Sequence, residues 1–265
     1  MRALFLYIIL QPLLFLTNPT AFDYKEIARV AVKANDITTD NLGNIYLLRK
    51  DELLKYNDQG VFLHSFSDKS LGTITNVDAT NFLKILVFYR DFSKVVFLDN
   101  MLAPTNSPIH LQRLQLEQAV LAASSHNNGM WIFDQASFQA IRLDQNLKIT
   151  HQTGNLMQLL NIPLNPNFIL ESNNMLYINN PQTGILVFDV YGTYYKTIPV
   201  TGLERFQVIE DEIFYLKNKQ LQNYNLKTLE EAKVEIPEQT PLQIRFEKKR
   251  LYILSPGFLS IYAID

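Results

Sequence analysis

The sequence contains no cysteine, only 9 glycines and a single tryptophan. Without cysteine it holds no residue for a disulfide, for a lipid attached to cysteine or for a thiol nucleophile. It also lacks a G-x-S-x-G motif and a phosphate-binding loop. The four histidines never stand at a metal-ligand spacing such as HxxxH, so we expect surface or strand-end positions for His64, His110, His126 and His151. The sequence therefore predicts no metal site and no cofactor.

The net charge is small, because the 24 Lys and Arg residues nearly balance the 26 Asp and Glu residues and leave a net charge of -2. No segment gathers the basic residues that a nucleic-acid backbone requires, so we expect no nucleic-acid partner. The length of 265 residues exceeds the usual size of one domain, yet closed all-β folds of this size often share one large core. We therefore expect a single domain over residues 22–265.

The first 21 residues have the pattern of a signal peptide. Arg2 precedes an apolar run over residues 3–16, and small residues follow at 17–21. Gln11 and Pro12 interrupt the run, which is too short for an uninterrupted membrane span. We predict a signal peptide over residues 1–21, an exported protein that is periplasmic or associated with the outer membrane, and no span after cleavage; the alternative is an uncleaved anchor.

Residues 37–66, ITTDNLGNIYLLRKDELLKYNDQGVFLHSF, contain four short apolar runs separated by three turn-forming clusters. Asn, Asp and Gly tolerate the positive-φ positions of tight turns, and the aromatic and branched residues between them favour strands. The segment therefore predicts a four-stranded antiparallel sheet. A sheet of this size leaves one face bare and needs neighbours.

The apolar pair of the second strand returns along the chain in steps of 40, 45, 46, 37 and 38 residues, at residues 45–46, 85–86, 130–131, 176–177, 213–214 and 251–252. Six units of similar size indicate radial repetition. Asp40-Asn41-Leu42-Gly43-Asn44-Ile45-Tyr46 fits D-x-x-G-N-I-Y, and residues 55–60 fit K-Y-x-x-x-G. On these motifs the chain resembles six-bladed β-propellers of the NHL and YVTN type. In its Asn-rich sequence pattern the chain also resembles exported envelope propellers of Bacteroidetes-type bacteria.

We expect an all-β, six-bladed β-propeller closed by an N-terminal strand in the last blade. The last unit supplies only three strands, and residues 24–33 form a strand without a blade of its own. Unpaired sheet edges would remain if the ring stayed open. Residues 27–32 are therefore predicted to pair beside residues 258–264. Residues 111–121 are interpreted as a connection rather than a helix, and residues 155–167 as a loop over one mouth of the channel.

The resemblance leaves an enzymatic alternative, a calcium-dependent propeller of the lactonase or sugar-dehydrogenase kind. Such an enzyme gathers carboxylates and amides from inner strands around an axial ion, and the candidates are Asp78, Glu171, Asn173 and Glu210. Asp99, Asp134, Asp144 and Asp189 recur at strand ends and are interpreted as turn formers. Trp131 is expected to pack between blades rather than to hold a ligand, and a single Trp argues against a sugar-binding propeller.

The favoured hypothesis is a non-enzymatic, monomeric scaffold that binds a protein partner in a cell-envelope assembly, such as an outer-membrane or secretion machine. The turns between second and third strands emerge on one rim, where aromatic and Arg side chains suit an interface. The predicted binding residues are Arg49, Tyr89, Arg90, Phe92 and Phe138. The alternative is that these aromatic side chains fold back onto their own blades.

Overall fold

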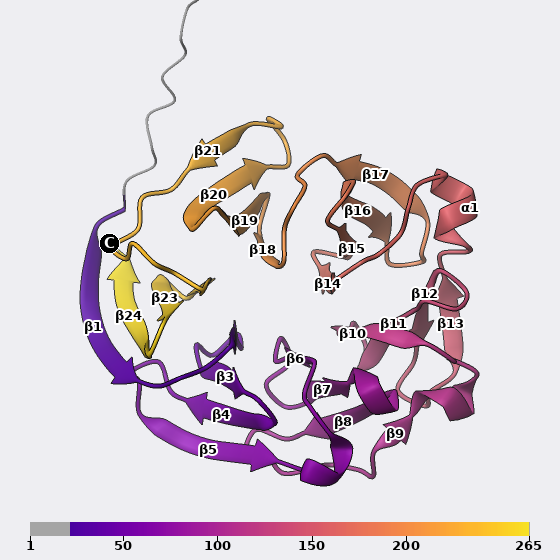
Figure 1. Cartoon of the computed structure of the whole chain (residues 1–265), viewed down its shortest axis with the longest axis horizontal. Coiled ribbons are helices and arrows are strands. Elements are labelled where there is room, and N and C mark those ends of the chain that lie inside the picture. The colour runs from indigo at the N-terminus through magenta and orange to yellow at the C-terminus, as the bar shows by residue number, and fades with distance from the viewer. Residues whose placement is uncertain (1–21, 265) are drawn as a thin grey trace, which may run out of the picture.

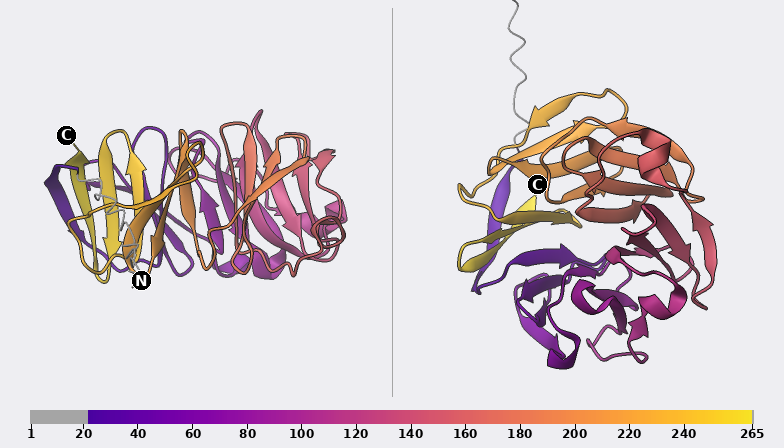
Figure 2. Two further views of the ribbon diagram at one scale, coloured as in Figure 1. Left: turned by 90° about the horizontal axis from the view of Figure 1, so that it is seen from above. Right: turned by 45° about the vertical axis from the view of Figure 1, so that its right-hand side comes forward.

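The computed structural model describes residues 22–264, which form six four-stranded antiparallel sheets around a central channel (Figure 1). The predicted all-β, six-bladed propeller is confirmed. Seen from the side the blades make a flat disc (Figure 2). The predicted signal peptide lies outside the described residues. None of the helices within residues 22–264 has the length and apolar character needed to cross a bilayer.

The blades are numbered in chain order, and their strands are given from the channel outward. Blade one contains β2 (Asp36–Thr39), β3 (Ile45–Arg49), β4 (Glu52–Tyr56) and β5 (Phe62–Ser67). Blade two contains β6 (Asn76–Asp78), β7 (Ile85–Tyr89), β8 (Lys94–Leu98) and β9 (Ile109–His110). Blade three contains β10 (Ala119–Ser125), β11 (Gly129–Asp134), β12 (Gln139–Leu143) and β13 (Ile149–Gln152).

Blade four contains β14 (Phe168–Ser172), β15 (Met175–Asn180), β16 (Gly184–Asp189) and β17 (Tyr194–Ile198). Blade five contains β18 (Phe206–Ile209), β19 (Glu212–Lys217), β20 (Gln220–Asn225) and β21 (Glu231–Lys233). Blade six contains β22 (Gln243–Glu247), β23 (Arg250–Ser255), β24 (Phe258–Ile264) and β1 (Tyr24–Ala31).

The ring is closed by β1, which lies along the outside of blade six (Figure 1). It pairs antiparallel with β24, from Tyr24 opposite Ile264 to Ala31 opposite Phe258. The strand begins at Tyr24 rather than at Ile27, and its side chains join the cluster between blades six and one. Both ends of the described chain are therefore tied into one sheet.

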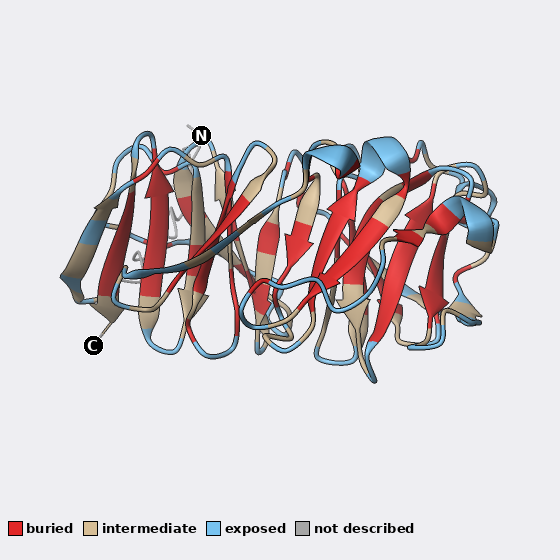
Figure 3. Cartoon of the chain, turned by 90° about the horizontal axis from the view of Figure 1, so that it is seen from below, coloured by how far each residue is buried: buried red, intermediate tan, exposed pale blue. Residues whose placement is uncertain are grey.

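The core lies between the blades rather than inside any one of them. The second and third strands are packed on both faces, so that all five residues of β7 and all six of β11 are buried. Outer strands such as β5 are half exposed. Burial follows this division, with buried strand centres and exposed turns on both rims (Figure 3). An apolar run without alternation therefore marks the middle of a blade.

One turn recurs after the third strand of five blades and explains how so few glycines suffice. A side-chain oxygen accepts from the backbone N–H two residues later and from a second N–H three or four residues later, at Asn57, Asp99, Asp144, Asp189 and Asn225. The turn-forming role predicted for three of these Asp residues is confirmed. The prediction also holds for Asp134, which forms a different turn: between β11 and β12 it accepts from the backbone N–H and the hydroxyl of Ser137, and it also accepts from the Gln118 N–H.

The connections also depart in part from expectation. Residues 111–121 contain both a 3-10 helix, η3 (Leu111–Leu114), and the start of β10. The segment 155–167 contains the helix α1 (Leu156–Leu160), which lies at the outside of the ring and not over the channel (Figure 1). Only residues 165–167 of this segment line a cavity at the channel mouth.

The first blade shows why its motif has the form D-x-x-G-N-I-Y. Asp40, which is fully buried, accepts from the backbone N–H of Leu42 and Asn44 and from the Asn44 amide. Tyr46 donates its hydroxyl to the same carboxylate at 2.8 Å. Burial and the Asp40 charge raise the pKa of Tyr46, so the phenol stays protonated as the donor.

We predict that Asp40→Ala lowers the free energy of unfolding by about 2–3 kcal/mol, because four hydrogen bonds to a buried carboxylate disappear and Tyr46 loses its acceptor. The control is Asp99→Ala, which removes two bonds in an exposed turn and should cost about 1 kcal/mol. Urea unfolding of both variants measures the difference, and equal losses would contradict the buried role of Asp40.

Candidate functional site

The turns between second and third strands all emerge on one side of the disc, here called the upper rim. Three 3-10 helices lie there: η1 (Lys69–Leu71), η2 (Arg90–Phe92) and η3. Helix η2 is itself the β7–β8 turn, and η1 and η3 lead into the inner strands of blades two and three. They are exposed where they project from the ring (Figure 3). This rim contains the residues predicted to bind a partner.

Tyr89 is buried and cannot contact a partner on this rim, so the prediction that it is a binding residue is wrong. Its side chain is 0% exposed and belongs to the core between blades one and two. Burial raises the pKa of Tyr89, so that its phenol remains neutral inside the core. The aromatic ring at the end of β7 therefore folds back onto its own blade, which is the alternative that the sequence left open.

Two other predicted residues are also engaged within the protein. Arg49 forms an ion pair with Glu52, with 2.5 Å between Nη2 and Oε2. Phe138 is half-buried against the core between blades three and four, and its carbonyl accepts from Leu156 at the start of α1. The five predicted residues are therefore spread over blades one, two and three, and one of them is buried.

Arg90 and Phe92 remain exposed on η2. Phe92 covers Gly72, where an added Cβ would lie 2.7 Å from its ring, and it still leaves 52% of its surface to solvent. Lys94 places its ammonium 5.4 Å from the centre of this ring. Arg90 lines a cavity of about 430 Å³ at the mouth of the channel. The turn thus presents an aromatic face beside cationic groups.

Sequence reasoning missed the basic neighbours of this turn. Partial burial, with Arg113 and Lys94 close by, lowers the pKa of His110. His110 ends β9 and Arg113 follows on η3, in agreement with the strand-end position predicted for this histidine. The spacing of Lys94, His110 and Arg113 along the chain carries no signal of their proximity. We call Arg90, Phe92, Lys94 and Arg113 the rim patch.

The candidates for an enzymatic site separate into two places. Asp78 and Glu171 line the channel, whereas Asn173 and Glu210 line a groove between blades four and five. Asp78 accepts from the backbone of Thr80 and Ser124, and Asn173 donates to the carbonyl of Glu210. Within residues 22–264 no group of three or more His, Asp or Glu side chains is arranged to hold a metal ion. These positions therefore do not converge on one calcium site.

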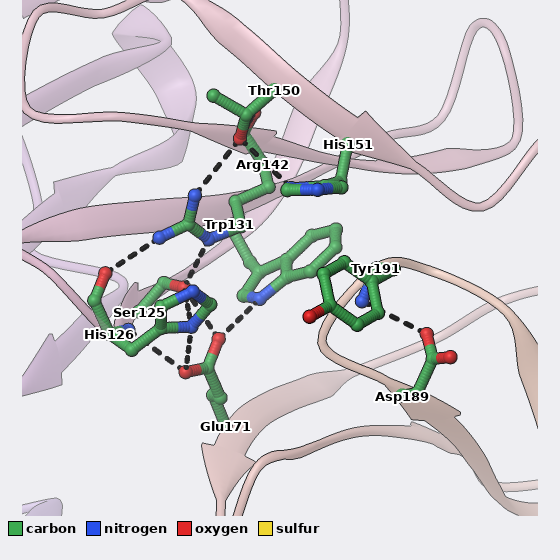
Figure 4. A network of polar contacts seen from close by, with 9 residues as sticks. All are labelled: Ser125, His126, Trp131, Arg142, Thr150, His151, Glu171, Asp189 and Tyr191. Atoms are coloured by element: carbon green, nitrogen blue, oxygen red, sulfur yellow. Dashed lines mark hydrogen bonds and ion pairs between the residues drawn. The ribbon is translucent and has the colours of Figure 1, made fainter.

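Glu171 is the centre of a polar network between blades three and four (Figure 4). It accepts from the Ser125 hydroxyl at 2.5 Å, from the His126 backbone at 2.8 Å and from Trp131 Nε1 at 2.6 Å. His126 Nδ1 lies 2.9 Å from the same carboxylate. Arg142 binds the other side of the network through Ser125, Thr150 and the His126 carbonyl.

This network resembles a catalytic triad in composition only. In a catalytic triad the histidine lies between the serine and the acid, whereas here the Ser125 hydroxyl donates directly to Glu171 at 2.5 Å and lies 3.4 Å from His126 Nδ1. Trp131 is fully buried and contributes its indole N–H, in agreement with the packing role predicted from the sequence. The group joins two blades.

Two arginines lie at the channel where the sequence suggested nothing. Arg205 reaches across it to Asp36 on blade one (2.6 Å) and Asn76 on blade two (2.9 Å). Its guanidinium also lies 5.3 Å from the ring of Phe168 on blade four. Arg245, on inner strand β22, is 8% exposed and donates to the carbonyls of Ile37 and Phe206 at 3.2 and 3.4 Å. The one available signal was a charged residue between Ile244 and Phe246 in a predicted strand.

No protein-family model matches this sequence, and no curated protein matches it. Solved propellers match most of it. A catalytically inactive variant of virginiamycin B lyase from Staphylococcus aureus with quinupristin has a TM-score of 0.61 at 12% identity, over 92% of this chain and 99% of that one. BamB from Moraxella catarrhalis has a TM-score of 0.57 at 11% identity, over 91% and 100%.

BBS1N in complex with ARL6DN has a TM-score of 0.56 at 9% identity, covering 88% of this chain and 78% of that one. Identities of 9–12% show the fold alone, and one fold supports many functions. The neighbours include a lyase and a propeller solved in a protein complex. The chain is therefore a propeller, and its function has to be argued from its own residues.

Proposed function

We propose that this protein is a non-enzymatic, exported propeller that binds a protein partner of the cell envelope through the rim patch. The observation that carries the proposal is Phe92, a half-exposed aromatic residue on η2 that packs over Gly72, beside Arg90 and Lys94. Aromatic and Arg side chains are among the residues that dominate interface energies. The likeness to a propeller solved in complex with another protein supports this reading as an analogy.

The charge of the patch indicates the chemistry of the partner. Arg90 shares η2 with Phe92 and with the exposed Asp91, the Lys94 ammonium lies 5.4 Å from the centre of the Phe92 ring, and Arg113 and Lys94 both lie near His110. Cations therefore outnumber acids at this patch, in a chain whose net charge is -2. A partner segment with carboxylates beside an apolar side chain would match both features. The export signal predicted at residues 1–21 supports a periplasmic or outer-membrane-associated setting. The Asn-rich turns, which resemble those of exported envelope propellers, support the same setting.

We predict that Arg90→Ala combined with Phe92→Ala weakens binding of the partner by about 2 kcal/mol, which corresponds to a roughly thirtyfold higher Kd. The partner is first identified by co-purification from native envelope membranes and mass spectrometry, then titrated against purified variants. Leu83→Ala with Met101→Ala is the matched control, because it removes two exposed apolar side chains from turns on the opposite rim of the same blade. If the Arg90/Phe92 variant keeps every partner, the patch has no binding role.

A further inference from the structure

The seam between blades five and six is packed less completely than the other seams. Within residues 22–264, the buried apolar cluster on the blade-six side of this seam consists of Leu251, Ile253 and Tyr262. Phe214 of blade five meets Phe246 of blade six at 4.9 Å between ring centres, and both rings remain half-buried. A cavity of about 340 Å³ lies in this seam, between β18, β19 and β22. We call it the seam cavity.

The seam cavity has two kinds of wall. Phe214, Leu216 and Ile244 supply half-buried apolar surface, and Leu242 is 48% exposed at its edge. Arg245 lines its inner end and also faces the channel. Polar side chains complete the lining, which also includes Glu204, Arg205, Gln207, Lys217, Asn218 and Gln243. A cavity lined by apolar side chains and a few polar groups is typical of sites for small ligands, and about 340 Å³ is near the lower end of their usual size.

Arg245 forms no ion pair with any carboxylate within residues 22–264. Its Nε and Nη1 reach two backbone carbonyls at 3.2 and 3.4 Å, and no bond to its Nη2 is found in that part of the chain. The two carboxylates that act on its charge are those of Asp36, on the adjacent blade one, and Asp78, on blade two. Both are already engaged by other donors, Asp36 by Arg205 and the Ile37 N–H, Asp78 by backbone N–H groups.

A buried guanidinium without a paired anion is costly, because desolvation favours the uncharged form. Burial, together with the nearby Arg205, lowers the pKa of Arg245 to about 10 against the opposing effect of Asp36 and Asp78. The side chain is still protonated at neutral pH. Arg142 shows the contrast, since it is 4% exposed and all three of its guanidinium nitrogens donate, at 2.7–2.9 Å.

We propose that the seam cavity binds a small organic carboxylate with an apolar body, whose carboxylate pairs with Arg245. A guanidinium donates two parallel hydrogen bonds to a carboxylate. A singly charged anion also matches the single charge of one buried arginine better than a multiply charged phosphate does. Phe214, Leu216 and Ile244 cover the apolar body.

The test uses the purified protein alone, so its outcome does not depend on a partner at the rim patch. Binding of three compounds is measured by calorimetric titration and by the shift in melting temperature. 3-Phenylpropionate has both the carboxylate and the apolar body, its amide has the same shape without the charge, and inorganic phosphate has charge without an apolar body. We expect the acid to bind about tenfold to a hundredfold more tightly than the amide and to raise the melting temperature. Inorganic phosphate is expected not to bind. Equal binding of acid and amide, tighter binding of phosphate, or no binding of the acid at millimolar concentration would overturn the proposal.

Two matched variants separate a ligand site from a structural arginine. Arg245→Met is expected to remove the preference for the acid while the unliganded protein melts at or above the wild-type temperature, because an unpaired buried charge is removed. Arg142→Met, which breaks a fully bonded guanidinium, should melt lower. If Arg245→Met also melts lower, or if it binds the acid as the wild type does, Arg245 serves the fold and the assignment is wrong.

Discussion

A chain that lacks residues 22–33 is expected to lose its cooperative thermal transition or to melt far below the intact domain. The deletion removes β1 and exposes the outer edge of β24 along its whole length. It also strips Ile27, Val30 and Val32 from the cluster between blades six and one. Burying such side chains contributes about 1.5–3 kcal/mol each, and the whole stability of a domain is about 5–15 kcal/mol.

Differential scanning calorimetry measures this effect. The control is a chain that begins at residue 22 and retains β1, which should melt like the full-length protein. A synthetic peptide of residues 22–33 added to the shortened chain is expected to restore part of the transition, since the pairing with β24 needs no covalent link. An unchanged melt after the deletion would show that β1 does not hold the ring closed.

The fold could be predicted because its signals are local. The apolar pairs of the second strands and the Asx turns after the third strands both lie within a few residues of sequence, at Asp99, Asp144 and Asp189 for example. Blade six lacked an outer strand in order along the chain, and the unpaired segment near Ile27 was the one candidate left to supply it. Counting strands was therefore enough to place β1 beside β24.

The side chains of the rim were harder to predict, because adjacent aromatic residues can face opposite ways. Tyr89 and Phe92 lie in one short segment, yet one is fully buried and the other is 52% exposed. The difference depends on the end of β7 and on Gly72 of the preceding connection, against which Phe92 packs. A sequence pattern of two aromatics and one arginine does not contain this information.

Contacts between blades were beyond local reasoning for a different reason. Glu171 receives donors from residues 40 to 46 positions earlier, and Arg205 binds Asn76 across the channel, 129 positions away. These partners depend on how each blade is aligned against the next one. The repeat spacing in the sequence does not determine that alignment. Glu171 was therefore nominated as a calcium ligand, although its oxygens are engaged by blade three.

Glu171→Gln is expected to lower the free energy of unfolding at neutral pH by about 3 kcal/mol, or roughly 6–12 °C in melting temperature. Glutamine keeps the shape but replaces one carboxylate oxygen by an NH₂ group that faces donors from Ser125 and Trp131. The control is Glu210→Gln, the same change at an exposed residue of blade five, which should stay within about 0.5 kcal/mol of the wild type. Equal losses would mean that the network does not stabilise the seam between blades three and four.

The pH dependence of this effect tests the ionised form directly. Burial by itself raises the pKa of Glu171, but hydrogen bonds from Ser125, His126 and Trp131 outweigh it and hold the pKa below the ordinary value of 4.5. A lowered folded-state pKa stabilises the protein fully above pH 4.5, and this contribution disappears as the pH falls through the folded-state value. Melting curves of wild type and Glu171→Gln should therefore converge below about pH 4.5. A constant difference between the curves down to strongly acid pH would show that the carboxylate charge is not what joins blades three and four.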